Sequence, residues 1–149
     1  MIDTIAPQGL KKVLLIDDDR VTNMMHTRVL SRSGLIEQID IATDGQDALD
    51  YLGRLGGGDA TPELILLDIN MPRMDGFEFL EEYARLPEHL RKGHIIIMLT
   101  TSLLESDRER ADASPWVLRF ANKPVKAEDV PDMVQAYWDT RTDDMARRA

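Results

Sequence analysis

The chain contains no cysteine, which excludes disulfide bonds, thiolate metal sites and cysteine nucleophiles together. It also has no apolar run that approaches the roughly 20 residues needed to span a bilayer. The N-terminal residues carry Asp3 and lack the basic and apolar pattern of a secretion signal. We therefore expect a cytoplasmic protein with no membrane segment.

Positive charge is scarce in this sequence. The 149 residues include 18 Lys and Arg against 27 Asp and Glu, which gives a formal net charge of −9 at pH 7. This excess of negative charge argues against direct binding to nucleic acid or to an anionic membrane surface, because both rely on basic side chains. The composition, 43% hydrophobic and 30% charged, is typical of one folded domain and not of a disordered chain.

Short apolar runs recur along the chain and predict strands. Three are apolar throughout, as strands covered on both faces are, and two are mixed or alternating and suit sheet edges. The predicted strands are residues 13–16, 39–42, 64–67, 95–99 and 116–121, and the predicted helices are residues 21–33, 46–55, 77–86, 104–111 and 127–140. Strand and helix alternate five times, which predicts an α/β fold with a doubly wound parallel sheet and helices on both faces.

Polar residues follow four of the predicted strands, at the sheet edge where open parallel sheets bind ligands. In chain order they are Asp17, Asp18 and Asp19, then Asp68, then Thr100, then Lys123. Crowded carboxylates repel one another, and a ligand set made only of oxygen atoms suits Mg²⁺. A carboxylate screened by a metal can accept a phosphoryl group, whose oxygens then need an ammonium and a hydroxyl nearby.

Four motifs, each after its own predicted strand, resemble those of the receiver domains of two-component response regulators. They are Leu15-Ile16-Asp17-Asp18-Asp19, residues 67–76 (LDINMPRMDG), Leu99-Thr100-Thr101 and Lys123-Pro124. Each motif alone is weak, but the four in this order and with these separations are specific. The resemblance implies a flavodoxin-like, CheY-like fold with five helices and strand order 2-1-3-4-5.

The resemblance covers about residues 11–139. It leaves an N-terminal extension at residues 1–10 and a C-terminal tail at residues 140–149. The mixed acidic and basic residues from Asp139 onward predict that the tail is loosely ordered.

The resemblance implies a role for each matching residue. Asp68 would be the phospho-acceptor, Asp18 a direct Mg²⁺ ligand, and Asp17 a ligand acting through a metal-bound water. Asp68 and the backbone carbonyl of Asn70 would complete the protein's share of the metal coordination. Mn²⁺ is an alternative ion for the same site.

Further matches concern the phosphoryl group and the switch. Thr100 would move toward the phosphoryl group, Lys123 would pair with its oxygens, and the Lys123–Pro124 peptide bond would be cis. Phe120 stands at the second switch position, where it keeps an aromatic ring but lacks the hydroxyl of a tyrosine. Thr101 is bulkier than the alanine that often follows the switch threonine.

The function implied by the resemblance is a phosphorylation switch that catalyses only its own phosphorylation and dephosphorylation. We expect a stand-alone receiver, because about ten residues follow the recognisable fold. Its partners would be a sensor histidine kinase or phosphotransfer protein and an unidentified downstream protein. The downstream protein would contact the fourth helix, fifth strand and fifth helix, about residues 104–140, and a homodimer through the same surface is a further expectation.

Other interpretations stay open or are opposed by particular residues. A phosphorelay intermediate or phosphate sink would use the same chemistry without an effector. The intact acidic cluster, Thr100 and Lys123 oppose a phosphorylation-independent binding module. A dehalogenase-type enzyme needs a second aspartate two residues after the nucleophile, where Asn70 stands, and a phosphotransfer bundle carrying His26 is opposed by the strand runs.

Three local features complete the expectations. Asp19 would cap the first helix, and Asp75-Gly76 would form the turn that starts the third helix. One of Met24 and Met25 would lie in the core without implying a cofactor.

Overall fold

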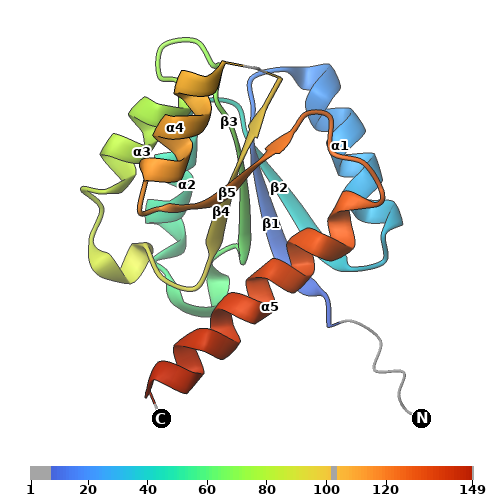
Figure 1. Ribbon diagram of the computed structural model, residues 1–149, viewed down its shortest axis with the longest axis vertical. Coiled ribbons are helices and arrows are strands. Elements are labelled where there is room, and N and C mark those ends of the chain that lie inside the picture. The colour runs from blue at the N-terminus through green and yellow to red at the C-terminus, as the bar shows by residue number, and fades with distance from the viewer. Residues whose placement is uncertain (1–7, 102–103, 149) are drawn as a thin grey trace.

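The structure is a computed structural model that describes residues 8–101 and 104–148 (Figure 1). Its centre is a five-stranded sheet in the order β2-β1-β3-β4-β5, in which every neighbouring pair is parallel. This confirms the expected fold class and strand order. The strands are β1 (Leu10–Ile16), β2 (Ile36–Ala42), β3 (Leu64–Asp68), β4 (Ile95–Thr100) and β5 (Val117–Asn122).

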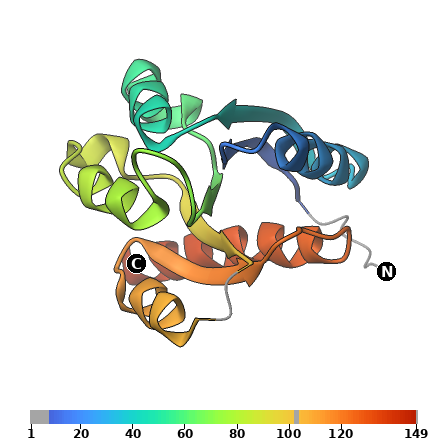
Figure 2. The same ribbon diagram turned by 90° about the horizontal axis from the view of Figure 1, so that it is seen from above.

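Five α-helices lie on the two faces of the sheet (Figures 1 and 2). Helices α1 and α5 pack on the face that carries Leu15 and Leu66, while α2, α3 and α4 pack on the face that carries Leu14 and Ile65. Adjacent strand residues point to opposite faces, so each apolar run contributes to both layers of core. The helices are α1 (Arg20–Arg32), α2 (Gly45–Leu55), α3 (Gly76–Tyr83), α4 (Glu105–Ala113) and α5 (Asp129–Arg148).

The pattern of burial explains why some strands were easier to predict than others. Every residue of β3 and β4 is buried, because each has neighbours on both sides and helices on both faces. The edge strands β2 and β5 each keep exposed positions, and their sequences alternate or mix accordingly.

Aspartates cap three helices at the sheet edge where the strands end: Asp19 caps α1, Asp44 caps α2 and Asp75 caps α3. Asp19 is the N-cap of α1, where its side chain accepts the N–H of Val21 at 3.2 Å. Asp75 caps α3 and forms a reciprocal capping box with Glu78. The expectations for Asp19 and Asp75 are both confirmed.

Two expectations about order and packing were wrong. The chain from Asp139 is helical and not a loose tail: α5 continues to Arg148, since no glycine or proline follows Pro131 of its first turn. Met24 and Met25 are 57% and 49% exposed, because the buried positions of α1 are Asn23, His26 and Leu30.

At the N-terminus, β1 begins at Leu10, so the predicted extension ends one residue earlier than expected. Residues 1–7 of that extension lie outside the described residues. Within the described part of the chain, no helix combines the length and apolar character needed to cross a membrane.

Candidate functional site

Three aspartates meet where β1 and β3 end. Asp17 and Asp18 follow β1 directly, and Asp68 is the last residue of β3. A carboxylate oxygen of each lies within 4.8 Å of one from each of the others. Asp17 and Asp68 are buried, with 3% and 5% exposed, whereas Asp18 is exposed to solvent. The sheet therefore gathers two buried charges and one accessible charge at a single point.

The side chain of Lys123 extends to this cluster from the end of the edge strand β5. Lys123 follows β5 directly, and its Nζ lies 2.7 Å from Asp17 Oδ2 and 3.3 Å from Asp68 Oδ1. The Lys123–Pro124 peptide bond is cis. One ammonium thus contacts both buried carboxylates, which come from two different strands.

Asp17 is held by contacts at both of its carboxylate oxygens. Oδ2 accepts from Lys123, and Oδ1 accepts the backbone N–H of Asp19 at 2.8 Å. The turn into α1 therefore fixes the orientation of Asp17 relative to Asp68.

Burial and the neighbouring charges change the pKa of Asp68. Burial raises the pKa of the Asp68 carboxyl to about 6, and repulsion from Asp17 acts in the same direction. Lys123 and the backbone N–H of Asn70 oppose this rise with smaller effects. Burial disfavours the ammonium of Lys123, but its hydrogen bond to Asp17 and the charge of Asp68 outweigh burial and raise the pKa of Lys123. Asp68 is therefore a carboxylate that additional positive charge would stabilise.

The two residues expected to act as a switch lie on the neighbouring strands. Thr100 is the last residue of β4 and is 2% exposed, and its backbone carbonyl accepts the N–H of Lys123 at 2.9 Å. Phe120 of β5 is half-buried, and the guanidinium of Arg108 on α4 lies 4.7 Å from its ring centroid. Thr101 is exposed directly after β4.

The segment between β3 and α3 packs closely on the backbone of Asp68. Gly76 donates its N–H to the carbonyl of Ile69 at 2.8 Å. A Cβ on Gly76 would lie 2.6 Å from the carbonyl oxygen of Asp68, so only glycine permits this approach. Asn70, two residues after Asp68, has an exposed side chain.

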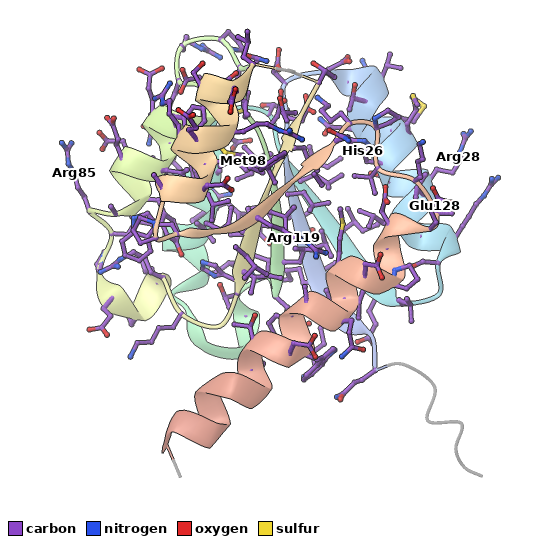
Figure 3. All side chains as sticks on the ribbon, in the orientation of Figure 1. His26, Arg28, Arg85, Met98, Arg119 and Glu128 are labelled. Atoms are coloured by element: carbon purple, nitrogen blue, oxygen red, sulfur yellow. The ribbon has the colours of Figure 1, made fainter. Side chains whose placement is uncertain are left out.

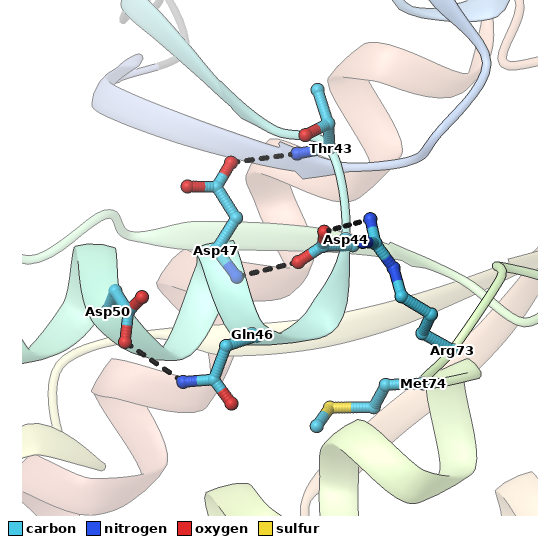
Figure 4. A pocket seen from close by; sticks show the side chains of 7 residues that line it. All are labelled: Thr43, Asp44, Gln46, Asp47, Asp50, Arg73 and Met74. Carbon is cyan, nitrogen blue, oxygen red and sulfur yellow. Dashed lines mark hydrogen bonds and ion pairs between the residues drawn. The ribbon is translucent and has the colours of Figure 1, made fainter.

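Contacts that the sequence did not predict hold this segment against α2 (Figure 4). Arg73 has a left-handed backbone with φ 67° and pairs with Asp44 at 3.0 Å, and Met74 lies against Gly45. A hollow of about 630 Å³ lies beside them, and the three carboxylates that line it, Asp44, Asp47 and Asp50, all accept hydrogen bonds. No short motif could have shown these contacts, because they join residues about thirty positions apart.

The family model for the response regulator receiver domain matches residues 13–135, a range that contains every site residue described above. The chain belongs to this family.

Two relatives align with this receiver domain over most of their length. It is 37% identical over 131 residues to the probable methanogenesis regulatory protein FilR2 of Methanothrix harundinacea, covering 85% of this chain and 82% of that protein. It is 34% identical over 133 residues to response regulator Rcp1 of Synechocystis, covering 86% of this chain and 88% of Rcp1.

A crystal structure of a two-component response regulator from Cytophaga hutchinsonii resembles the receiver domain with a TM-score of 0.82 at 29% identity, covering 89% of this chain and 99% of that one. Some relatives are much longer. The chain spans 29% of the length of a protein-glutamate methylesterase/protein-glutamine glutaminase of Xanthomonas oryzae, to which it is 34% identical over 113 residues.

The donor set of the receiver domain fits a hard divalent cation. Asp17, Asp18 and Asp68 offer carboxylate oxygens, and the exposure of Asp18 leaves one side of the cluster open to solvent. Mg²⁺ prefers oxygen ligands and keeps several of its waters, so a half-open carboxylate cluster suits it. Burial, and after it repulsion from Asp17, raises the pKa of Asp68, so a cation at this point would favour its charged form.

Proposed function

We propose that this receiver domain accepts a phosphoryl group on Asp68 from a phosphohistidine of a sensor histidine kinase or phosphotransfer protein. The observation that carries the proposal is the contact of one ammonium, Lys123, with two buried carboxylates at 2.7 and 3.3 Å, next to a third carboxylate that is exposed. We take residues 10–148, from the start of β1 to the end of α5, as the receiver unit in place of the expected 11–139, and the cytoplasm as its location.

Asp17, Asp18, Asp68 and the backbone carbonyl of Asn70 would hold Mg²⁺, or Mn²⁺ in its place. When bound, the ion would supply positive charge to the phosphoryl oxygens and screen the carboxylates. Asp18 is suited to direct ligation because it is exposed, while Asp17 is buried and already accepts two hydrogen bonds. Asp17 therefore acts through a bound water in this proposal.

In the transfer step, a carboxylate oxygen of Asp68 attacks phosphorus and the P–N bond of the phosphohistidine breaks. The electron pair of that bond remains on the imidazole, which takes a proton from solvent. Lys123 lies close enough to Asp68 to pair with the phosphoryl oxygens after transfer. The domain changes only its own covalent state, so it acts as a switch and not as an enzyme on other substrates.

The signal would leave through α4, β5 and α5. Thr100 lies at the site end of β4, and Phe120 lies on β5 beneath Arg108 of α4, so a shift of Thr100 toward the phosphoryl group can alter this surface. Leu104 and Leu118 are 63% and 46% exposed there, as expected of a surface that contacts a downstream protein or a second copy of the chain.

The proposal is tested by intact mass after incubation with acetyl phosphate, with and without Mg²⁺. Wild type should gain one phosphoryl group only with Mg²⁺, and Asp68→Asn should gain none because it lacks the nucleophilic oxygen. Asp112→Asn, an exposed change on α4, should behave as wild type. A wild-type protein that neither gains mass nor binds beryllium fluoride would contradict the proposal.

A further inference from the structure

Helix α1 carries polar side chains at buried positions that face the sheet. Its buried residues are Asn23, His26 and Leu30, with 4%, 2% and 0% exposed. Their spacing of three and four positions places them on one face of the helix. A core-facing helix is normally apolar at such positions, because a buried polar group is costly unless it is hydrogen-bonded.

Both polar residues bind backbone groups beside the functional site. Asn23 Nδ2 donates to the carbonyl oxygen of Asp17 at 2.9 Å. His26 Nε2 accepts the backbone N–H of Val125 at 3.1 Å, and Val125 is 2% exposed. Figure 3 shows His26 where α1 faces the segment that follows β5. The first contact holds the backbone of Asp17, and the second holds the backbone two residues after Lys123.

The hydrogen bond to His26 completes a two-sided restraint on Lys123. On its own backbone, the N–H of Lys123 donates to the carbonyl of Thr100 at 2.9 Å. Two residues later, the N–H of Val125 donates to His26. The backbone that bears the Lys123 side chain is therefore tied to β4 on one side and to α1 on the other.

We propose that His26 is a positioning residue that sets the ammonium of Lys123 against Asp17 and Asp68. The proposal rests on the proposed phosphoryl transfer, since it gives His26 a part in that reaction without contact to the reacting atoms. Asn23, one turn earlier on α1, also holds site backbone, by donating to the carbonyl of Asp17. The helix thereby aligns residues that follow two different strands, β1 and β5.

The proton state of His26 agrees with this role. Nε2 can accept the N–H of Val125 only while it carries no proton. Burial lowers the pKa of His26, and the positive charge of Lys123 lowers it further, against a smaller opposite effect of Asp17. The ring is therefore neutral at neutral pH and available as an acceptor.

The test compares two replacements of His26 with a control histidine. His26→Leu fills similar space without an acceptor, and His26→Gln offers a side-chain carbonyl to Val125. His94→Leu is the control, because His94 precedes β4 at the end of the strands away from the site, where its ring packs against Tyr83. The readouts are the rate of phosphorylation by acetyl phosphate at saturating Mg²⁺ and the ¹H–¹⁵N signal of the Lys123 ammonium, which is visible only when hydrogen bonds slow its exchange with water.

We expect His26→Leu to phosphorylate about tenfold or more slowly and to lose the Lys123 signal, because small displacements of aligned groups slow reactions strongly. His26→Gln should keep the signal and stay within about threefold of wild type, since its acceptor can replace the imidazole nitrogen. His94→Leu should match wild type in both readouts. If His26→Leu does not fold, His26→Met, which also lacks an oxygen or nitrogen acceptor, takes its place.

A wild-type rate and an intact Lys123 signal in His26→Leu would overturn the inference. So would equal losses in His26→Leu, His26→Gln and His94→Leu, which would indicate general destabilisation. If wild type itself takes up no phosphoryl group, the proposed function fails, and the Lys123 signal alone still decides whether His26 positions that side chain.

Discussion

At the residue scale, Asp68 combines burial with a neighbouring like charge. Its pKa of about 6 lies above the value of 3.8 expected for an unperturbed aspartate. The folded protein therefore binds this proton more tightly than the unfolded chain does. The corresponding stability is fully present below about pH 3.8 and is lost as the pH rises through about 6.

This pKa leads to a prediction for Asp68→Asn in metal-free buffer. A neutral amide avoids the cost of the buried charge, so the variant should be more stable than wild type by about 1–3 kcal/mol near pH 8. The difference should shrink toward about pH 5, where the wild-type carboxyl is mostly protonated. Urea unfolding across this range measures it, with Asp112→Asn as the control, and a difference that does not vary with pH would count against the assigned burial and repulsion.

At the element scale, the segment from β3 to α3 decides where Asp68 lies. Gly76 lets the start of α3 approach the Asp68 carbonyl, and the Asp75–Glu78 capping box fixes that start. On the other side, Arg73 pairs with Asp44 and Met74 packs against Gly45 at the start of α2. Two helices therefore hold the segment that follows Asp68, the proposed phospho-acceptor.

We predict opposite effects for two glycine-to-alanine substitutions in helices. Gly76→Ala should destabilise by about 1–3 kcal/mol and slow phosphorylation, because its Cβ meets backbone atoms that cannot easily move. Gly53→Ala, where no atom lies within 4 Å of the added Cβ, should stabilise by up to about 1 kcal/mol. Thermal and urea unfolding of both variants check this, and a neutral Gly76→Ala would show that α3 does not restrain Asp68.

At the scale of the whole molecule, Mg²⁺ should stabilise the fold, because the site joins β1 and β3 only when the chain is folded. At a concentration 100 times the Kd, the gain should be about 2.7 kcal/mol. Asp18→Asn should lose most of it, since Asp18 is the exposed proposed ligand. Asp19→Asn should keep it, because asparagine also caps helices and Asp19 is no proposed ligand. A full Mg²⁺ response in Asp18→Asn would remove Asp18 from the ligand set.

Most of the fold could be predicted from local patterns in the sequence. Every residue of β3 and β4 is buried, so their continuous apolar runs predicted both strands. Asp17 and Asp18 follow β1 and Asp68 ends β3, so a parallel sheet brings these carboxylates together. The contact of His26 with Val125 joins residues 99 positions apart and leaves no periodic signal. The exposure of Met24 and Met25 was missed for a related reason: polar residues took the buried positions of α1.

The proposed function places the phosphoryl group on Asp68. It is tested most directly by treating the protein with acetyl phosphate and Mg²⁺, reducing it with borohydride, and locating the product by mass spectrometry of peptides. Borohydride converts an aspartyl phosphate to homoserine, so we expect homoserine at position 68 and unchanged Asp17, Asp18 and Thr100. Homoserine at another aspartate, or phosphate retained on a hydroxyl residue, would contradict it.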